Sequence, residues 1–360
     1  MRYSSIDLMR TIAICVMVIV HFGENLAGYI PPITGFGAPL FAFLSGMSYR
    51  LWVNGQEARQ RSHEEISKVS VRRGLFVFGI GIAFNVLVWL PEDVFNWDVL
   101  TFIGTALLIL NLVRQQPAPL LLFMAFLSLF FAPVFRYLVD YNAYWTNNYF
   151  DYDFTLSDVL IGYLVTGYFP LFPWITYSLV GFLLAGWMFP PSGQPAPNVR
   201  GVLLSGTALV LLSGLAVWTH PTTSTAMTKI FWLGWKMYPP TTEYVAGTLG
   251  MAMVLFGTLH ACVDRNPRIS ENNVVLGIAM ACSRNAFTIY LLHHLVHVWP
   301  MWVYGLAMGQ NPDYYWKQLL PASTALLLAG LFLALMFFIL WRFGPDRNHG
   351  IERWMRWLCD

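Results

Sequence analysis

Ten stretches of the sequence are apolar over about the length that a helix needs to cross a bilayer, about 20 residues. A soluble domain carries roughly 25% charged residues, whereas this chain carries 11%. We therefore expect an all-α fold, a polytopic integral membrane protein with about ten transmembrane helices. The expected spans are residues 5–23, 35–53, 74–90, 98–113, 118–135, 171–189, 201–218, 244–262, 285–305 and 319–341.

The basic residues gather in alternate connections between these expected spans. The connections 47–74 and 263–284 and the tail at about 342–360 are rich in Lys and Arg. The opposite set of connections is acidic, above all the long one at 136–170. Because cytoplasmic loops of membrane proteins carry the excess of Lys and Arg, we expect both the N-terminus and the C-terminus in the cytoplasm.

We interpret residues 1–360 as a single transmembrane domain. Segment 54–70 is polar and charged, and we expect it to form a cytoplasmic helix on the membrane surface. Segment 161–174, IGYLVTGYFPLFPW, is apolar but contains two prolines, so we expect an interfacial or re-entrant element there. The four cysteines have no paired spacing, and neither a disulfide framework nor a cysteine zinc site is expected.

The first expected span contains three ionisable residues, Asp7, Arg10 and His21. A helix turns by about 100° per residue, so the eleven steps from Arg10 to His21 end about 20° past three full turns. The two side chains therefore share one face, about 16 Å apart along the axis, and Asp7 is placed to pair with Arg10. This polar stripe is an interfacial anchor with a hydrogen-bonded histidine, a proton path, or a site where Arg10 holds phosphate oxygens and His21 accepts a proton.

A set of segments in chain order resembles the transmembrane acyltransferase superfamily (acyltransferase-three-like). Within it the sequence looks closest to bacterial relatives of heparan-α-glucosaminide N-acetyltransferase. The first span contains an Arg, ten intervening residues and a His, read here as RTIAICVMVIVH. The other similar segments are GFGAPLFAFLSGMSYRLW, VRRGLFVFGIGI, WDVLTFIGTALLIL, YFPLFPWITYSLVGFLLAGW, KMYPPTTEYVAGTLG and CSRNAFTIYLLHHLV.

The resemblance implies an enzyme that takes an acyl group, by default acetyl, from cytoplasmic acyl-CoA or acetyl-CoA. The group would cross the membrane to a hydroxyl or amine of an extracytoplasmic glycan or lipid-linked sugar. His21 would be the catalytic base, by direct transfer rather than through an acyl-histidine. The residues implied in binding the donor or the acceptor are Asp7, Arg10, Ser45, Arg72, Arg73, Tyr290 and His293. The implied location is the bacterial cytoplasmic (inner) membrane.

Several of these residues also have simpler interpretations. Arg72 and Arg73 would equally suit anionic lipid headgroups. Asp98 is better explained as a helix N-cap than as a catalytic group, and Lys236 as a solvated cation than as a contact to the acceptor. Glu24 lies one turn past His21 and could orient it.

His293 and His297 have the i,i+4 spacing of a metal-binding pair. No carboxylate ligand lies near them in the sequence, and no His-Glu-x-x-His pattern is present. We therefore expect packing or tunnel lining and no metal.

Two other functions would also fit a chain of this kind. A secondary transporter would use intramembrane ionisable residues and broken helices, although the two halves show no inverted hydropathy repeat. A non-catalytic membrane subunit would keep the acyltransferase scaffold within a larger assembly. The expected partners are the lipid bilayer, the sugar acceptor and a membrane-protein partner or a second copy of the chain, and no nucleic acid.

Overall fold

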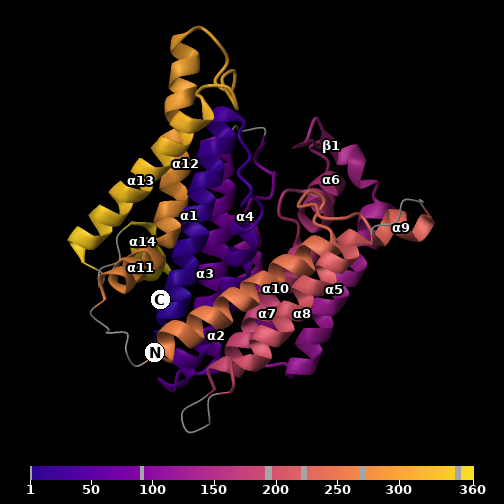
Figure 1. Ribbon diagram of the computed structural model, residues 1–360, viewed down its shortest axis with the longest axis vertical. Coiled ribbons are helices and arrows are strands. Elements are labelled where there is room, and N and C mark those ends of the chain that lie inside the picture. Colours follow the sequence, from indigo (N-terminus) through magenta and orange to yellow (C-terminus); the bar gives the residue numbers. More distant parts are fainter. Residues whose placement is uncertain (1, 90–92, 191–196, 220–224, 267–272, 345–349) are drawn as a thin grey trace. The chain divides into compact units, whose positions relative to one another are not determined.

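The computed structural model of the chain describes residues 2–89, 93–190, 197–219, 225–266, 273–344 and 350–360. Nearly all regular structure in these residues is helical (Figure 1), with one two-stranded antiparallel ribbon, β1 (Trp145–Thr146) and β2 (Tyr149–Phe150). The chain divides into two compact units. One unit is Phe41–Thr258, and the other joins Arg2–Leu40 to Leu259–Leu358.

The first unit contains most of the helices. It has nearly all of α2 (Gly37–Glu57), followed by α3 (His63–Phe84), η1 (Asn85–Trp89), α4 (Val99–Val113), α5 (Ala118–Leu138), η3 (Tyr141–Tyr144), α6 (Leu156–Ile161), η4 (Gly162–Thr166), α7 (Leu171–Met188), α8 (Arg200–Trp218), α9 (Ala226–Phe231) and α10 (Thr242–Leu259). Within this unit α3 packs against α4, and α5 packs against α7.

The second unit is built around the first helix of the chain. It contains α1 (Ser4–Ala27), η5 (His260–Asp264), α11 (Val274–Arg284), α12 (Ala286–Ala307), α13 (Ala322–Phe343) and α14 (Ile351–Cys359). Helix α1 contacts α11, α12 and α13, and Figure 1 shows α12 running alongside α1. The first helix therefore forms the centre of this unit.

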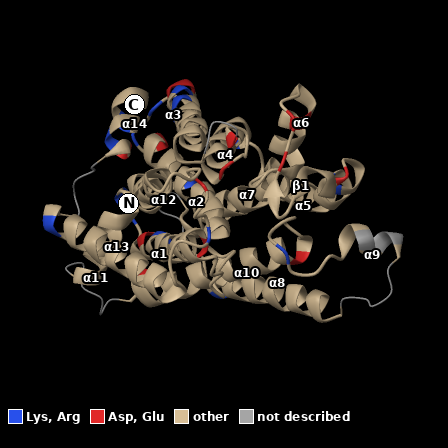
Figure 2. Ribbon diagram, turned by 90° about the horizontal axis from the view of Figure 1, so that it is seen from above, with Lys and Arg blue, Asp and Glu red and all other residues tan. Residues whose placement is uncertain are grey.

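Seven helices of the described residues are long and apolar enough to cross a membrane, and eight if α11 and α12 are one broken span bent by 76°. This confirms a polytopic, helical membrane protein, and Figure 2 shows helices that are largely free of charged residues. All ten expected stretches contain helix. Two of them, in α2 and α4, do not pass the test of length and apolarity, so ten spans and cytoplasmic termini stay predictions.

Two expected connections have a different structure. Segment 54–70 is not one surface helix, because α2 continues to Glu57 and a new helix begins at His63. The new start is a capping box, in which Ser62 accepts from the Glu65 amide and the Glu65 carboxylate accepts from the Ser62 amide. The connection 263–284 contains α11, which Asn273 caps and which ends at the bend before α12.

Segment 161–174 interrupts the helical structure, as its two prolines led us to expect. The helical turn η4 ends at Thr166, Gly167–Pro170 is not helical, and α7 begins at Leu171. Proline at position 170 suits a helix start, because its missing N–H is one that the first turn leaves unpaired. Its depth in a membrane stays a prediction.

Glycines let helix backbones approach closely within the Phe41–Thr258 unit. A Cβ added at any of these glycines would press on the facing helix. Such small-residue crossings are typical of membrane helices, where close packing replaces the hydrophobic effect. The crossings are Gly46 with Gly181 (α2–α7), Gly74 with Gly104 (α3–α4) and Gly206 with Gly250 (α8–α10).

We predict that Gly46→Ala destabilises the protein. Its new methyl group would overlap the backbone carbonyl of Ser178, which cannot move aside without shifting α7. Overpacking of this kind costs about 1–3 kcal/mol, so the thermal midpoint of the detergent-solubilised protein should fall. Gly79→Ala is the matched control, because no atom lies within 4 Å of its added Cβ. Equal midpoints for the two variants would show that the α2–α7 crossing is not tightly packed.

Candidate functional site

The face of α1 that carries Arg10 and His21 lies against the broken helix pair α11–α12. Arg10 donates to the Ser283 hydroxyl at the end of α11, and His21 is hydrogen-bonded to His293 of α12. The shared face predicted from the helix period is therefore confirmed. The same face of α1 contacts α11 near the N-terminus of α1, which is predicted to be cytoplasmic, and contacts α12 farther along the helix.

Three imidazoles meet where α1 contacts α12. The Nδ1 atom of His21 lies 2.9 Å from Nε2 of His293. The rings of His21 and His294 have centroids 4.6 Å apart, and those of His293 and His294 4.1 Å apart. His293 and His294 are buried, and His21 is half-buried. Tyr290 completes the group, with its ring 5.5 Å from that of His293.

The hydrogen positions in this cluster follow from the acceptors that surround it. Nδ1 of His293 lies 3.3 Å from the carbonyl oxygen of Ile289, and a carbonyl only accepts, so we assign the hydrogen to this Nδ1. In a neutral ring Nε2 of His293 is then an acceptor. The bond to His21 takes its hydrogen from Nδ1 of His21, which leaves the lone pair of His21 on Nε2.

A second pair repeats this arrangement one turn further along. Nδ1 of His297 donates to the carbonyl of His293. Its Nε2 accepts from the side-chain amide of Asn25, at 2.8 Å. Because Asn25 is four residues after His21, both side chains lie on the same face of α1. The i,i+4 spacing of His293 and His297 thus lets them make two successive contacts to α1, with His21 and with Asn25.

Near the start of α1 the ion pairs differ from those expected. Asp7 forms a two-bond ion pair with Arg2, at 2.6 and 2.8 Å, and lies 3.9 Å from Arg10. The main partner of Arg10 is Ser283. The expected Asp7–Arg10 pair is therefore the longer of two contacts, because the planar guanidinium of Arg2 donates one N–H to each oxygen of the carboxylate.

Glu24 lies close to a cation and not in the histidine cluster. Its carboxylate is 3.2 Å from the ammonium of Lys317, in the connection between α12 and α13. The Nδ1 atom of His21, which Glu24 was expected to orient, is instead hydrogen-bonded to His293. The orienting contact of His21 therefore comes from α12.

The remaining expected site residues belong to the Phe41–Thr258 unit. Ser45 bonds to the Ala42 carbonyl at 2.7 Å and to Ser178 at 3.0 Å, within the α2–α7 crossing. Asp98 accepts from the Leu100 amide and caps α4, which confirms its expected structural role. Lys236 is exposed, as expected for a solvated cation.

Arg73 and Arg72 point to different surroundings on α3. The guanidinium of Arg73 lies over the ring of Trp52, 4.8 Å from its centroid, in a cation–π contact. Arg72 is exposed. A role of either residue in donor binding stays a prediction.

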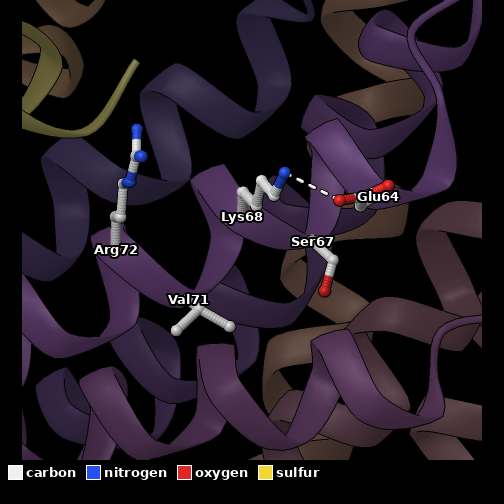
Figure 3. Close-up of a pocket in the computed structure, with 5 residues that line it drawn as sticks. All are labelled: Glu64, Ser67, Lys68, Val71 and Arg72. Carbon is white, nitrogen blue, oxygen red and sulfur yellow. Dashed lines mark ion pairs between the residues drawn. The ribbon is translucent and has the colours of Figure 1, made fainter.

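Arg72 lines a shallow hollow of about 330 Å³ on the first turns of α3 (Figure 3). The other lining residues are Glu64, Ser67, Lys68 and Val71. Lys68 reaches toward Glu64, with 2.7 Å between its ammonium and the carboxylate, whereas Arg72 points away from that pair. The hollow thus offers one basic side chain that is not engaged with Glu64.

Sequence reasoning missed four residues of the site, namely Arg2, Asn25, Ser283 and His294. Asn25 could have been found, because its spacing from His21 is that of one helix face. His294 gave a weaker signal: consecutive helix residues point about 100° apart, so only the structure shows that His293 and His294 both reach His21. The expectation of no metal took no account of His294 as a third ligand, and the structure places it beside the other two.

Helix α12 is held at its N-terminus by a carboxylate from α14. Glu352 accepts from the backbone amides of Phe287 and Thr288, at 2.7 and 2.9 Å, and from the Thr288 hydroxyl. These amides belong to the first turn of α12, which has no intrahelical acceptors for them. Burial raises the pKa of the Glu352 carboxyl.

The comparison with known families shows the family of the protein, and the fold and this stripe agree with it. A polytopic helical chain with an arginine and a histidine on one face of its first span has the features of a transmembrane acyltransferase. Residues 2–204 match the family model described as heparan-alpha-glucosaminide N-acetyltransferase, catalytic. The match covers more than half of the chain, and the chain belongs to this family. A search of the curated proteins gives no significant match.

The matched region contains α1 with Arg10 and His21 but ends within α8. His293, His294 and His297 therefore lie outside it. Their place in the site comes from the contacts between α1 and α12 alone.

We predict that docking of α14 strengthens as the pH falls toward the ordinary pKa of a glutamate, about 4.3. A carboxyl whose pKa is raised in the folded state favours that state when protonated, and the gain is lost as the pH rises through the raised value. Hydrogen exchange of the amides in α14 should measure this. Glu352→Gln, a neutral acceptor of the same shape, is the reference at each pH, so that the intrinsic pH dependence of exchange cancels. A constant ratio between the two proteins would contradict the prediction.

Proposed function

We propose that this protein transfers an acyl group, acetyl in the simplest case, from cytoplasmic acyl-CoA to a hydroxyl or amine of an extracytoplasmic glycan or lipid-linked sugar. Membership of the acetyltransferase family supports the reaction class. The observation that carries the proposal for this chain is the hydrogen bond from His21 Nδ1 to His293 Nε2. This bond leaves a lone pair on Nε2 of His21 and holds the ring in a fixed orientation.

In the proposed reaction Nε2 of His21 takes the proton of the acceptor hydroxyl or amine. The acceptor atom forms a bond to the thioester carbonyl carbon, and the C–S bond breaks. The proton then passes from His21 to the departing thiolate of CoA, so that one base serves both halves of the step. His293 accepts from Nδ1 throughout and fixes the tautomer, as the third member of a catalytic triad does for its histidine.

The donor would be held by cations near the cytoplasm-predicted ends of the helices. CoA is polyanionic, and guanidinium groups bind phosphate oxygens through two parallel hydrogen bonds. Arg10, half-buried and held by Ser283, would line the path of the pantetheine arm. Arg72, on the hollow of α3 in the other compact unit, is a separate candidate for a phosphate contact.

We expect His21→Ala to lower acyl transfer by about 10²- to 10⁴-fold, because a positioned general base contributes that much. The measurement is CoA release and acetyl incorporation, with acetyl-CoA and a panel of amino and neutral sugars, in proteoliposomes. His63→Ala, an exposed histidine at the start of α3, is the control and should keep the wild-type rate. A folded His21→Ala protein that transfers at the wild-type rate would remove His21 from the mechanism.

We expect His293→Leu to lower kcat on the order of 10²-fold with the KM for acetyl-CoA unchanged, because an orienting acceptor acts on the base and not on donor binding. His293→Gln keeps an amide oxygen that can accept from Nδ1 and should recover part of the rate. If Leu and Gln are equally damaging, or if KM changes and kcat does not, His293 acts only in packing.

A further inference from the structure

We propose that His21, His293 and His294 form a binding site for a transition-metal dication of the Zn²⁺ type, and that the bound ion switches off acyl transfer. The site itself stands on the geometry of the cluster. The second statement rests on the proposed function, because it concerns the same His21.

The three rings have the placement that a metal ion requires. One ring nitrogen from each residue can be chosen so that all three lie within 4.8 Å of one another. Two nitrogens bound to tetrahedral zinc at about 2.0–2.1 Å are about 3.3 Å apart. The 2.9 Å between His21 and His293 needs to open by only a few tenths of an ångström. The ring of His294 closes the third side, and a water or anion would take the fourth position.

The convergence of His293 and His294 is the feature that ordinary helix packing does not require. Consecutive residues of a helix point about 100° apart. Here both rings lie within 5.2 Å of the ring of His21, centroid to centroid, and both are buried. The ligands are also anchored, since α12 is fixed at its start by Glu352 and contacts α1 again through Asn25 and His297.

The donor set selects the kind of metal. Three neutral imidazoles without a carboxylate suit Zn²⁺, Cu²⁺, Ni²⁺ or Co²⁺ and are unsuitable for Mg²⁺ or Ca²⁺, which prefer oxygen ligands. Glu24, the acidic residue nearest to His21 in the sequence, is engaged with Lys317. Zinc has no strong geometric preference and so fits a site built from two helices.

Metal binding would change which nitrogen of His21 carries the hydrogen. The ion would occupy Nδ1, which donates to His293 in the metal-free cluster. A neutral imidazole bound through Nδ1 keeps its hydrogen on Nε2, so the proton moves from one nitrogen to the other and none is released. Nε2 is the nitrogen that takes the acceptor's proton in the proposed reaction. The metal-bound enzyme would therefore lack its base.

Binding is tested first and without reference to activity. The purified full-length protein, stripped with a chelator, is titrated with Zn²⁺ in competition with a chromophoric indicator, and with Co²⁺ to record the visible absorption of a tetrahedral complex. We expect one equivalent of either ion, not displaced by Mg²⁺. His294→Leu and His21→Ala should lose it, while His63→Ala should retain it. The absence of a saturable equivalent, or its retention in both cluster variants, would overturn the site.

Inhibition is tested second, on the same samples. Transfer by the wild type should fall at least tenfold as the single zinc site fills, and return after chelation. Zinc that binds in one equivalent and leaves the rate unchanged would overturn the switch while the site stands. A protein that transfers no acyl group to any acceptor would refute the proposed function, and with it the switch, but the binding experiment would still decide the site.

Discussion

The hydrogen bond between His21 and His293 is the interaction on which the rest of the site depends. Imidazoles inside a bundle of apolar helices cost several kcal/mol if their polar atoms are left without partners, and the rings of His21, His293 and His297 find partners in their neighbours. The chain does this with backbone carbonyls, since Ile289 and His293 accept from the rings of His293 and His297. A helix holds its carbonyls rigidly. The tautomer of His21 is therefore set by the backbone of α12.

Matched spacing explains how one helix face can contact two polar groups so far apart. Arg10 and His21 are about 16 Å apart along α1, and their partners Ser283 and His293 are ten residues apart, which is about 15 Å at helical rise. The chain bends by 76° between α11, which ends just after Ser283, and α12, which runs on beside His21. The buried carboxylate of Glu352 then satisfies the amides that the break leaves without intrahelical acceptors.

The sequence predicted what depends on neighbours along the chain. Helix period places Arg10 and His21 on one face, and local propensity makes Asp98 a cap; both were predictable and are confirmed. Contacts between distant segments were not. The helix period predicts which face of α1 is polar but not which residue contacts that face. The ion pair between Glu24 and Lys317 could therefore not be predicted from the sequence. The prediction of the partner of Asp7 was incomplete for another reason. Arg2 precedes the helix, where the helix period does not apply.

A neutral partner for His21, in place of the carboxylate of a serine-protease triad, has consequences for both proposals. A carboxylate would stabilise the imidazolium strongly and bind a metal as a charged ligand. Histidine does neither, because in the neutral state its Nε2 is only a dipolar acceptor. In the proposed reaction His21 then holds the acceptor's proton briefly and passes it to the departing thiolate, which favours direct transfer over a long-lived acyl-enzyme. The same neutrality makes the cluster a site for borderline metals alone, since only imidazole nitrogens face the ion. The three rings thus support proton transfer when no metal is bound, and a bound dication abolishes that proton transfer.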